Sequence, residues 1–373
     1  MLLLTLAVSM HAVAGTFAEE HDPSRGQFVG IHSGDVDAFS QAELTGSDHV
    51  LRLPTQASPA RRYTFAEALF WTLREGSADN WAQVITPEKL VDSYAGTATL
   101  IEAPFDWSTG FRVGWGRRAA ADGLEGTVSY THFRTRATSH AAGEVYSAFL
   151  GNFYVGNPDG ALFGPHYRSA DIDWDVDFHA IDLRARRAFA VSPSLVVRPF
   201  VGLKAAVINQ SIHSKWREPI DTLLTTYKFN SATEDLRQDF WGIGPSLGVD
   251  LEIPWHTEPR YTIKFFAAPS AALMFGHWTF SDVYQNDGPT TTTIPTPTSI
   301  AIRTSPITGA ATMLRGAMGV EWTQCFARAT TTVRLSYEAQ VWLNQMQFYS
   351  YNMGRLNNLM SLHGGVLELR IAY

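Results

Sequence analysis

Apolar and polar residues alternate along much of this chain. The C-terminal segment 367–373 reads LELRIAY, so that apolar residues occupy almost every second position and charged residues fall between them. Successive side chains of a β-strand point to opposite faces, and a period of two residues therefore indicates a strand with one apolar and one polar face. A helix would distribute the same charges around its circumference.

Ten segments carry this alternation, and most match or exceed the about 9–11 residues with which a tilted strand crosses a bilayer. They are residues 65–74, 107–117, 124–135, 171–188, 195–208, 239–253, 261–275, 310–323, 329–343 and 360–373. Long and short connections between these segments alternate along the chain, as residues 75–106 and 118–123 illustrate. Barrels of the outer membrane show this asymmetry, because their periplasmic turns are short and their external loops are long.

The sequence therefore predicts an all-β fold, an antiparallel up-and-down transmembrane barrel of about ten strands. Further strands hidden in residues 75–105 and 136–170 would widen it to twelve or more. In hydrocarbon every backbone N–H and C=O needs a partner within the protein, so strands span a membrane only as a closed barrel. A soluble β-sandwich shows the same alternation, but it has no reason to keep alternating connection lengths.

The N-terminal region predicts export. The apolar stretch 2–14 ends in Ala-Val-Ala, the small-x-small pattern of a signal-peptide cleavage site, although no Lys or Arg precedes it. We expect residues 1–14 to be a signal peptide, the alternative being a short buried helix. Residues 15–62 are polar and predict an N-terminal extension, either a mobile leader or a plug, before a barrel over residues 63–373. Beyond residue 14 no window of about 18 apolar residues predicts a membrane-spanning helix.

Composition narrows the class of protein further. Charged residues make up 17% of the chain and aromatic residues 12%, whereas soluble domains average about 25% charged residues. The net charge of −7, without a run of Lys or Arg, lacks the basic surface with which proteins bind nucleic acid. The single cysteine, Cys325, excludes an intramolecular disulfide, and no Cys/His spacing predicts a metal site or a cofactor.

Aromatic residues lie near the ends of several segments, where barrels carry girdles at both membrane interfaces. We expect the periplasmic girdle to contain Tyr261, Trp322 and Tyr373. We expect the external girdle to contain Trp174, Trp241, Phe275 and Trp278. The terminal Tyr373 also resembles the C-terminal signal that barrel assembly machinery recognises, so this machinery and outer-membrane lipid are the expected partners.

Four aspartates occupy every second position of one predicted strand: Asp171, Asp173, Asp175 and Asp177. They share a face opposite Ile172, Trp174, Val176 and Phe178. We interpret the aspartate face as the wet interior near the external mouth, where carboxylates would favour cations. A Ca²⁺-binding ladder and a polar face compensated by interior arginines are the alternatives. The apolar positions then shift phase to Ile181, which predicts a bulge near His179.

Charged residues on the polar side of other predicted strands are expected to line the interior as well: Arg112, Arg198, Lys204, Lys264, Arg315, Arg334, Glu338, Glu368 and Arg370. Both signs are present, so the interior is either a wet pore or a salt-bridged polar core. Barrels of about eight strands are filled by side chains and those of about sixteen are open, so that ten strands leave little free space.

Several segments resemble the pore-forming outer-membrane proteins of the major-outer-membrane-protein-like (MOMP-like) family. They are FAEALFWTLREGSADNWA (65–82), FDWSTGFRVGWG (105–116), EGTVSYTHF (125–133), WDVDFHAIDLRARRAFAVSPSLVVRPFVGLKAAVINQ (174–210) and FWGIGPSLGVDL (240–251). The resemblance covers most of the chain after about residue 60, and the cues follow the order of the family. It implies a bacterial outer-membrane barrel that conducts small solutes, with a homo-oligomer such as a trimer as a family-level assembly, and it implies no catalytic residues.

We therefore expect a passive outer-membrane pore for small solutes or ions, with selectivity set by interior charges. The alternative is a surface-exposed adhesin or structural barrel with a plugged lumen. An enzyme is not expected, because the sequence contains neither GxSxG nor HExxH. A rim-located catalytic site would draw on His132, His140, His166 or His179 with a nearby acid.

Overall fold

The computed structural model of the protein describes residues 61–76, 79–86, 97–119, 123–147, 166–192, 194–220, 228–288, 299–350 and 354–373. The regular elements in these ranges are β-strands, and none of the described residues belongs to a helix suited to crossing a membrane. The predicted signal peptide 1–14 and residues 15–60 of the predicted extension lie outside the described residues.

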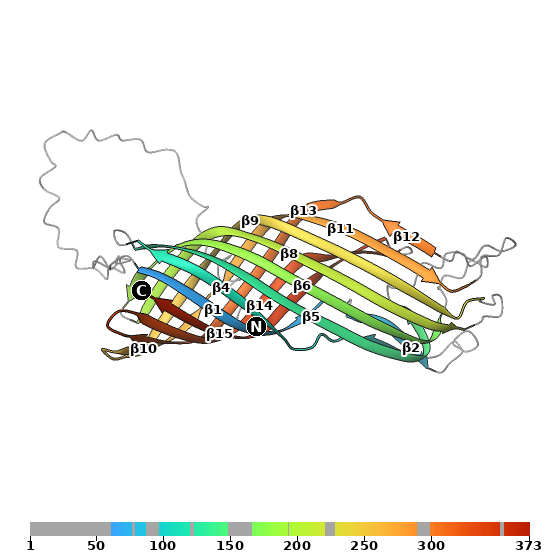
Figure 1. Ribbon diagram of the computed structural model, residues 1–373, viewed down its shortest axis with the longest axis horizontal. Coiled ribbons are helices and arrows are strands. Elements are labelled where there is room, and N and C mark those ends of the chain that lie inside the picture. The colour runs from blue at the N-terminus through green and yellow to red at the C-terminus, as the bar shows by residue number, and fades with distance from the viewer. Residues whose placement is uncertain are drawn as a thin grey trace, which may run out of the picture. The chain divides into compact units, whose positions relative to one another are not determined.

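Ten strand positions form a closed antiparallel ring (Figure 1). In ring order the strands are β1 (Arg61–Arg74), β4 (Ser108–Arg118), β5 (Leu124–Ser147), β6 (Tyr167–Arg187), β8 (Leu195–Pro219), β9 (Ser231–Thr257), β10 (Tyr261–Ala267) continued by β11 (Ser270–Asn286), β13 (Ile307–Cys325), β14 (Thr330–Ser350) and β15 (Gly354–Ala372). The ring closes where β15 pairs with β1, from Tyr63 opposite Ala372 to Arg74 opposite Ser361. The predicted all-β antiparallel barrel is confirmed, and each of the ten predicted segments coincides largely with one position of the ring.

Four shorter strands lie outside this ring: β2 (Asn80–Thr86), β3 (Thr97–Glu102), β7 (Phe189–Ser192) and β12 (Ser299–Arg303). β2 pairs with β3 and with the outer end of β5, from Ala82 opposite Ser147 to Ile85 opposite Glu144. The connection 75–105 thus contains strands, as the sequence allowed, but they do not widen the ring of described strands.

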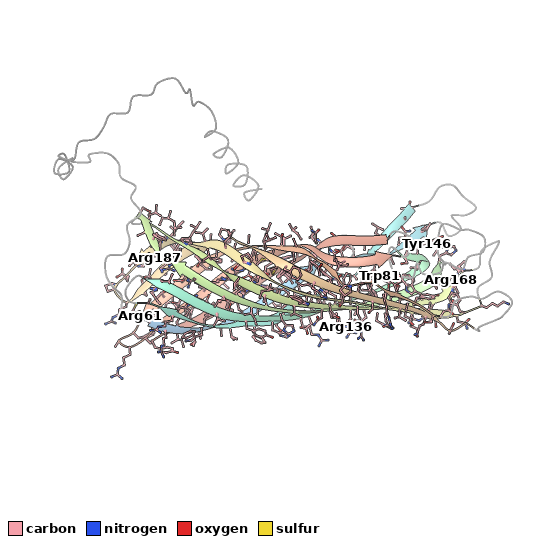
Figure 2. All side chains as sticks on the ribbon, turned by 90° about the horizontal axis from the view of Figure 1, so that it is seen from above. Arg61, Trp81, Arg136, Tyr146, Arg168 and Arg187 are labelled. Carbon is pink, nitrogen blue, oxygen red and sulfur yellow. The ribbon has the colours of Figure 1, made fainter. Side chains whose placement is uncertain are left out.

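The two ends of the barrel differ in their connections. Short turns join β4 to β5, β9 to β10 and β13 to β14 at the end that also holds Arg61, Arg187 and the C-terminus (Figures 1 and 2). Trp81, Tyr146 and Arg168 mark the opposite end, toward which strands such as β9, with 27 residues, extend. Because short turns of outer-membrane barrels lie on the periplasmic side, we call the first end the periplasmic rim and the second the external end.

The outward face of each long strand changes character along its length. On β9 the outward side chains from Trp241 to Ile253 are apolar, with Leu247 64% exposed, whereas Asp235, Arg237 and Asp239 face outward nearer the external end. Thirteen residues at about 3.3 Å each, tilted by about 40°, span about 30 Å, which is the thickness of a hydrocarbon core. This apolar lipid band marks the membrane, and the external parts of the strands project from it.

The inward face changes in the opposite sense at the external border of the lipid band: its side chains are charged within the band and apolar beyond it. On β6 the inward side chains of Asp182, Arg184 and Arg186 lie within the lipid band, whereas Trp174 and Phe178 are buried inside the projecting part. The predicted bulge near His179 is wrong, because β6 keeps one register with β5 and β8 through this position. The apolar residues change face since lipid surrounds one part of the strand and water surrounds the other, while the backbone continues unchanged.

Candidate functional site

The interior of the barrel within the lipid band is lined by charged side chains, which we call the ionic half. Its cations are Arg112, Arg118, Arg184, Arg186, Arg198, Lys204, Lys264, Arg315, Arg334 and Arg370. Its carboxylates are Glu67, Glu125, Asp182, Asp250, Glu252, Glu321, Glu338 and Glu368. The nine interior charges that the sequence predicted outside the aspartate row therefore all face inward.

One cluster of these charges joins strands that are not neighbours in the ring. Arg112 on β4 donates from Nη2 to Glu338 Oε1 on β14 over 2.9 Å, and it also contacts Glu67 on β1. Arg315 on β13 donates to the other oxygen of Glu338 over 2.7 Å. β4 and β14 are separated in the ring by β15 and β1, so the Arg112–Glu338 hydrogen bond spans part of the lumen, whereas Arg315 and Glu338 lie on neighbouring strands. Charge-assisted bonds of this kind are short and strong, and here they hold the walls together.

A second cluster lies nearer the periplasmic rim. Lys264 donates to Glu252 over 3.1 Å and to Glu321 over 3.2 Å, and Arg334 donates to Glu321 over 2.5 Å. Arg186 donates to Asp250 over 2.7 Å. Glu252 and Glu321 each contact more than one cation, and Asp250 contacts Arg186. Buried charges require such partners, because they have left bulk water.

Two cavities open between these clusters. One of about 180 Å³ lies at the rim beside Arg198, Lys264 and Glu321, and one of about 70 Å³ lies deeper, beside Arg112, Arg186 and Glu338. Both volumes accommodate several water molecules among polar partners. The ionic half thus holds polar-lined space large enough for water, and the larger cavity lies at the periplasmic rim.

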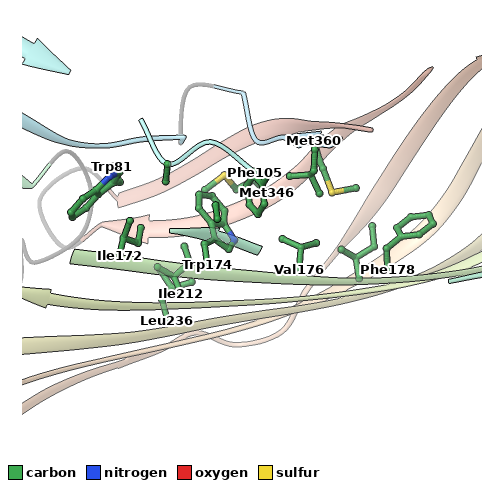
Figure 3. Packing of buried hydrophobic residues seen from close by; sticks show 14 of the residues in the cluster. Trp81, Phe105, Ile172, Trp174, Val176, Phe178, Ile212, Leu236, Met346 and Met360 are labelled. Atoms are coloured by element: carbon green, nitrogen blue, oxygen red, sulfur yellow. The ribbon is translucent and has the colours of Figure 1, made fainter. Parts of the chain in front are cut away.

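The interior of the projecting part is packed with apolar side chains, which we call the apolar half (Figure 3). Phe178 on β6 and Trp342 on β14 meet across the lumen with ring centroids 5.5 Å apart, and Phe240 and Trp278 lie 4.9 Å apart. Along β14 the inward side chains change from charged to aromatic between the ionic half and the apolar half. Gln340 Nε2 donates a hydrogen bond to Glu338 Oε1, and Trp342 Nε1 donates one to Gln340 Oε1. Among the described residues, large side chains therefore fill the width of the barrel at this level.

The connection between β1 and β4 contributes to this filling. Glu75, which follows β1, accepts a 2.9 Å hydrogen bond from Gln210 on β8, on the far side of the ring. Trp81 of β2 packs against Trp216 at 5.6 Å between ring centroids, and Phe105 against Trp174 at 5.3 Å. Part of the first external connection therefore folds into the mouth of the barrel, which no local sequence pattern predicted.

Some carboxyl groups are buried in the apolar half. Burial raises the pKa of Glu75 well above its ordinary value, although the hydrogen bond from Gln210 acts in the opposite direction. Burial also raises the pKa of Asp282 to about 7, and nearby Asp235 adds to this rise. Both groups lie in the projecting part, and the cause is the lack of water around the charged form.

The prediction that the four aspartates line the interior is wrong. Asp171, Asp173, Asp175 and Asp177 lie on the outer face of the projecting part, with 31–40% of each side chain exposed. Their partners are His140 and Arg217 for Asp171, Arg136 for Asp173, Arg134 for Asp175, and His132 with His179 for Asp177. All of these partners lie on neighbouring strands except His179, which is on β6 itself. Of the histidines considered for an enzyme, three therefore belong to this outer face, and His166 lies near Glu144.

The physical reason is that alternation defines two faces but not which of them is wet. At the level of the aspartates the surroundings are aqueous, so the charged face turns outward and the apolar face packs inside. The alternative of a Ca²⁺ ladder loses its basis for three of these aspartates, because the carboxylates of Asp171, Asp173 and Asp175 are engaged by Arg217, Arg136 and Arg134.

Some residues of the predicted aromatic girdles lie on the outer face of the barrel, and others are buried inside it. Trp241 and Phe275 are exposed on the outer face near the external border of the lipid band, and Trp322 and Tyr373 near the periplasmic one, where Tyr261 is half-buried. Trp174 and Trp278 are buried in the apolar half, so their assignment to the external girdle is wrong. They lie on the inward face of strands that have already left the membrane.

The closed ring, the apolar band and the ionic interior define a transmembrane β-barrel of the outer-membrane class. Residues 59–372 match the family described as Legionella pneumophila major outer membrane protein precursor. The protein belongs to this family and is located in the bacterial outer membrane, which confirms the resemblance seen in the sequence.

Comparison with known proteins gives more distant similarities. A search of characterised sequences found no significant match. Among solved structures, the outer membrane protease OmpT from Escherichia coli is similar with 9% identity and a TM-score of 0.37, covering 85% of this chain and 97% of its own. The Pseudomonas putida toluene transporter TodX gives 8% identity, a TM-score of 0.22 and coverages of 86% and 92%. A Pseudomonas aeruginosa FadL homologue is similar with 10% identity and a TM-score of 0.24, covering 84% of this chain and 90% of its own.

Proposed function

We propose that the protein is a narrow outer-membrane pore whose wet, ionic half opens to the periplasm and whose apolar half closes the lumen. The observation that carries this proposal is the change along the barrel axis, from charged walls with cavities to aromatic side chains that meet across the lumen. Apolar constrictions close channels because water and ions leave a bulk-like environment to enter them. Small solutes or ions would pass only when the apolar half is displaced.

Selectivity would follow from the ionic half. Its ten cations exceed its eight carboxylates, which favours small anions rather than the cations expected from the aspartate row. The aspartates lie on the outer face and pair with neighbouring cations, so they do not enter this balance.

Conductance of the purified barrel in planar bilayers tests the proposal. We expect rare, small conductance steps for the wild type and frequent, larger steps for the double variant Phe178→Ala/Trp342→Ala. Each substitution costs about 3–5 kcal/mol of stability, so the fold is first verified by the heat-dependent mobility of the barrel on gels. The double variant Trp241→Ala/Phe275→Ala removes an outward aromatic pair of similar size, 6.0 Å apart, and is expected to leave conductance unchanged. A folded interior variant that never conducts would contradict the proposal.

Replacing the four aspartates with asparagine gives a second test. Introduced into the conducting variant, Asp171→Asn, Asp173→Asn, Asp175→Asn and Asp177→Asn together are expected to leave the reversal potential in a salt gradient unchanged. Their side chains lie outside the lumen, and their charge is compensated on the surface. A clear shift toward anion preference would show that permeating ions pass this face.

A permanently closed surface barrel is the second candidate. The projecting outer face carries paired charges such as Arg136 with Asp173 and His213 with Asp235, which suit a water-exposed binding surface for another molecule. In that case the interior variant would stay silent while external binding persisted.

We also propose that β15 is the segment read by barrel assembly machinery. The backbone N–H of Tyr373 donates to Arg62 O over 2.9 Å, so the last residue sits beside the first strand at the seam of the ring. That the protein assembles as a homo-oligomer is a further proposal, and it rests on the resemblance to the family.

A further inference from the structure

A cluster of two histidines and one aspartate lies on the outer face, where β5 and β6 leave the lipid band. His132 on β5 is directly opposite His179 on β6, and Asp177 is two residues away from His179 on the same face. Side chains two residues apart on one strand, together with the cross-strand neighbour, form a compact triangle on a sheet. The outward neighbours Phe111 and Tyr130 place this triangle at the external membrane border.

The three side chains present their donor atoms to one another. Nε2 of His132 lies 3.2 Å from Asp177 Oδ1, and Nε2 of His179 lies 3.3 Å from Asp177 Oδ2. One donor atom from each residue can be chosen so that all lie within 4.8 Å of one another. Metal-to-ligand distances of about 2.0–2.2 Å place tetrahedral ligand atoms about 3.3–3.6 Å apart. The two histidine–aspartate distances are close to this spacing, and a rotamer adjustment would bring all three ligand atoms to it.

Two further observations favour a ligand at this position. Oδ1 of Asp177 is shut off from solvent and accepts no hydrogen bond, although the ring of His132 is near. The hydroxyl of Tyr130 lies 2.8 Å from Nδ1 of His179. If Nδ1–H donates to this hydroxyl, the lone pair of Nε2 is left free toward Asp177, as in metal sites whose histidines are oriented by an outer hydrogen bond.

Asp177 also differs from the other aspartates of its row. Asp171, Asp173 and Asp175 each contact an arginine, which satisfies a carboxylate without any ion. Among the described residues, the ion pairs place no arginine or lysine against Asp177, and its partners are the two histidines.

We propose that His132, Asp177 and His179 form a surface site for a divalent transition metal such as Zn²⁺ or Cu²⁺. Two imidazole nitrogens and one carboxylate oxygen match the preference of these ions, whereas Ca²⁺ and Mg²⁺ take oxygen ligands. Three protein ligands leave one position open to water or to an anion in the outer leaflet. The sequence did not indicate this site, because its ligands come from two strands 45 residues apart and follow no metal-binding spacing.

Titration calorimetry of the full chain in detergent, stripped of metal with a chelator, tests the proposal with Zn²⁺ as the probe. We expect one Zn²⁺ per chain, unaffected by excess Ca²⁺ or Mg²⁺. His132→Ala, His179→Ala and Asp177→Asn are expected to lower the affinity at least about tenfold, and Tyr130→Phe by about tenfold through loss of the orienting hydrogen bond.

His213→Ala is the matched control, because His213 forms a two-residue pair with Asp235 on the same outer face. It should bind Zn²⁺ as the wild type does. With Cu²⁺ as the probe, the electron paramagnetic resonance spectrum should show two coordinating nitrogens, reduced to one in each histidine variant. Absence of Zn²⁺ binding, or binding that survives all three ligand substitutions, would overturn the proposal. These outcomes do not depend on conductance, so this site and the pore stand or fall separately.

Discussion

Replacing Glu338 with alanine is expected to destabilise the barrel by about 3–5 kcal/mol. Glu338 is 1% exposed and accepts hydrogen bonds from Arg112 and Arg315, so its loss leaves two guanidinium groups with fewer partners in a narrow interior. Arg112 retains its contact with Glu67, whereas Arg315 has no other carboxylate among the ion pairs of the described residues.

The measurement is equilibrium unfolding in urea, followed by tryptophan fluorescence of the barrel in detergent or liposomes. Glu338→Gln keeps an acceptor of similar size and is expected to lose less than the alanine variant. Asp235→Ala, on the exposed outer face, should change the free energy of unfolding by less than about 1 kcal/mol. If Glu338→Ala also lowered the free energy of unfolding by less than about 1 kcal/mol, this prediction would be contradicted. That result would mean that water solvates the arginines freely and that the ionic half is much wider than described.

Replacing Leu247 with arginine is the second large effect. Leu247 lies near the middle of the outward apolar row of β9, and a cation there is expected to cost about 2–4 kcal/mol in a bilayer. The cost falls toward the interfaces, because the side chain then reaches water or headgroups.

Thr279→Arg is the control for this substitution. Thr279 faces outward on the neighbouring strand β11, beyond the apolar band and opposite Asp239, so that the new charge remains in water. We expect little change in the unfolding free energy in liposomes. Equal costs at both positions would contradict the proposed limit of the lipid band.

The sequence was sufficient to predict the barrel because strand alternation and connection lengths are local features. Each predicted segment lies largely within one strand position of the ring, and the nine charges on the polar side of the membrane-crossing parts face inward. Within the lipid band the apolar face of each strand turns toward the lipid, so the polar face of every strand can be assigned to the interior.

The external half could not be assigned by that rule. The alternation of β6 is continuous, but its apolar residues pass from outside to inside at His179 because the surroundings change from lipid to water. Nothing in the sequence of a single strand marks the height of the membrane. The row of aspartates and the apolar and aromatic residues opposite it are the two faces of one alternation, and this alternation fits a wet interior as well as a wet exterior.

The folding of the first connection into the barrel mouth was missed for another reason. β2 and β3 are short, and Trp81 and Phe105 are held by contacts with Trp216 and Trp174, which are distant in sequence. Such contacts follow from closure of the ring and have no local pattern.

Spin-label accessibility along β6 tests most directly that the strand exchanges its wet and dry faces where it leaves the membrane. Single cysteines are introduced into a Cys325→Ser background, since Cys325 is the one native cysteine. We expect labels at positions 181 and 183 to collide with oxygen from the lipid, labels at 173 and 175 with a water-soluble nickel complex, and labels at 176 and 178 with neither. Oxygen accessibility at 176 and 178 together with nickel accessibility at 181 and 183 would show that the faces are assigned the wrong way round.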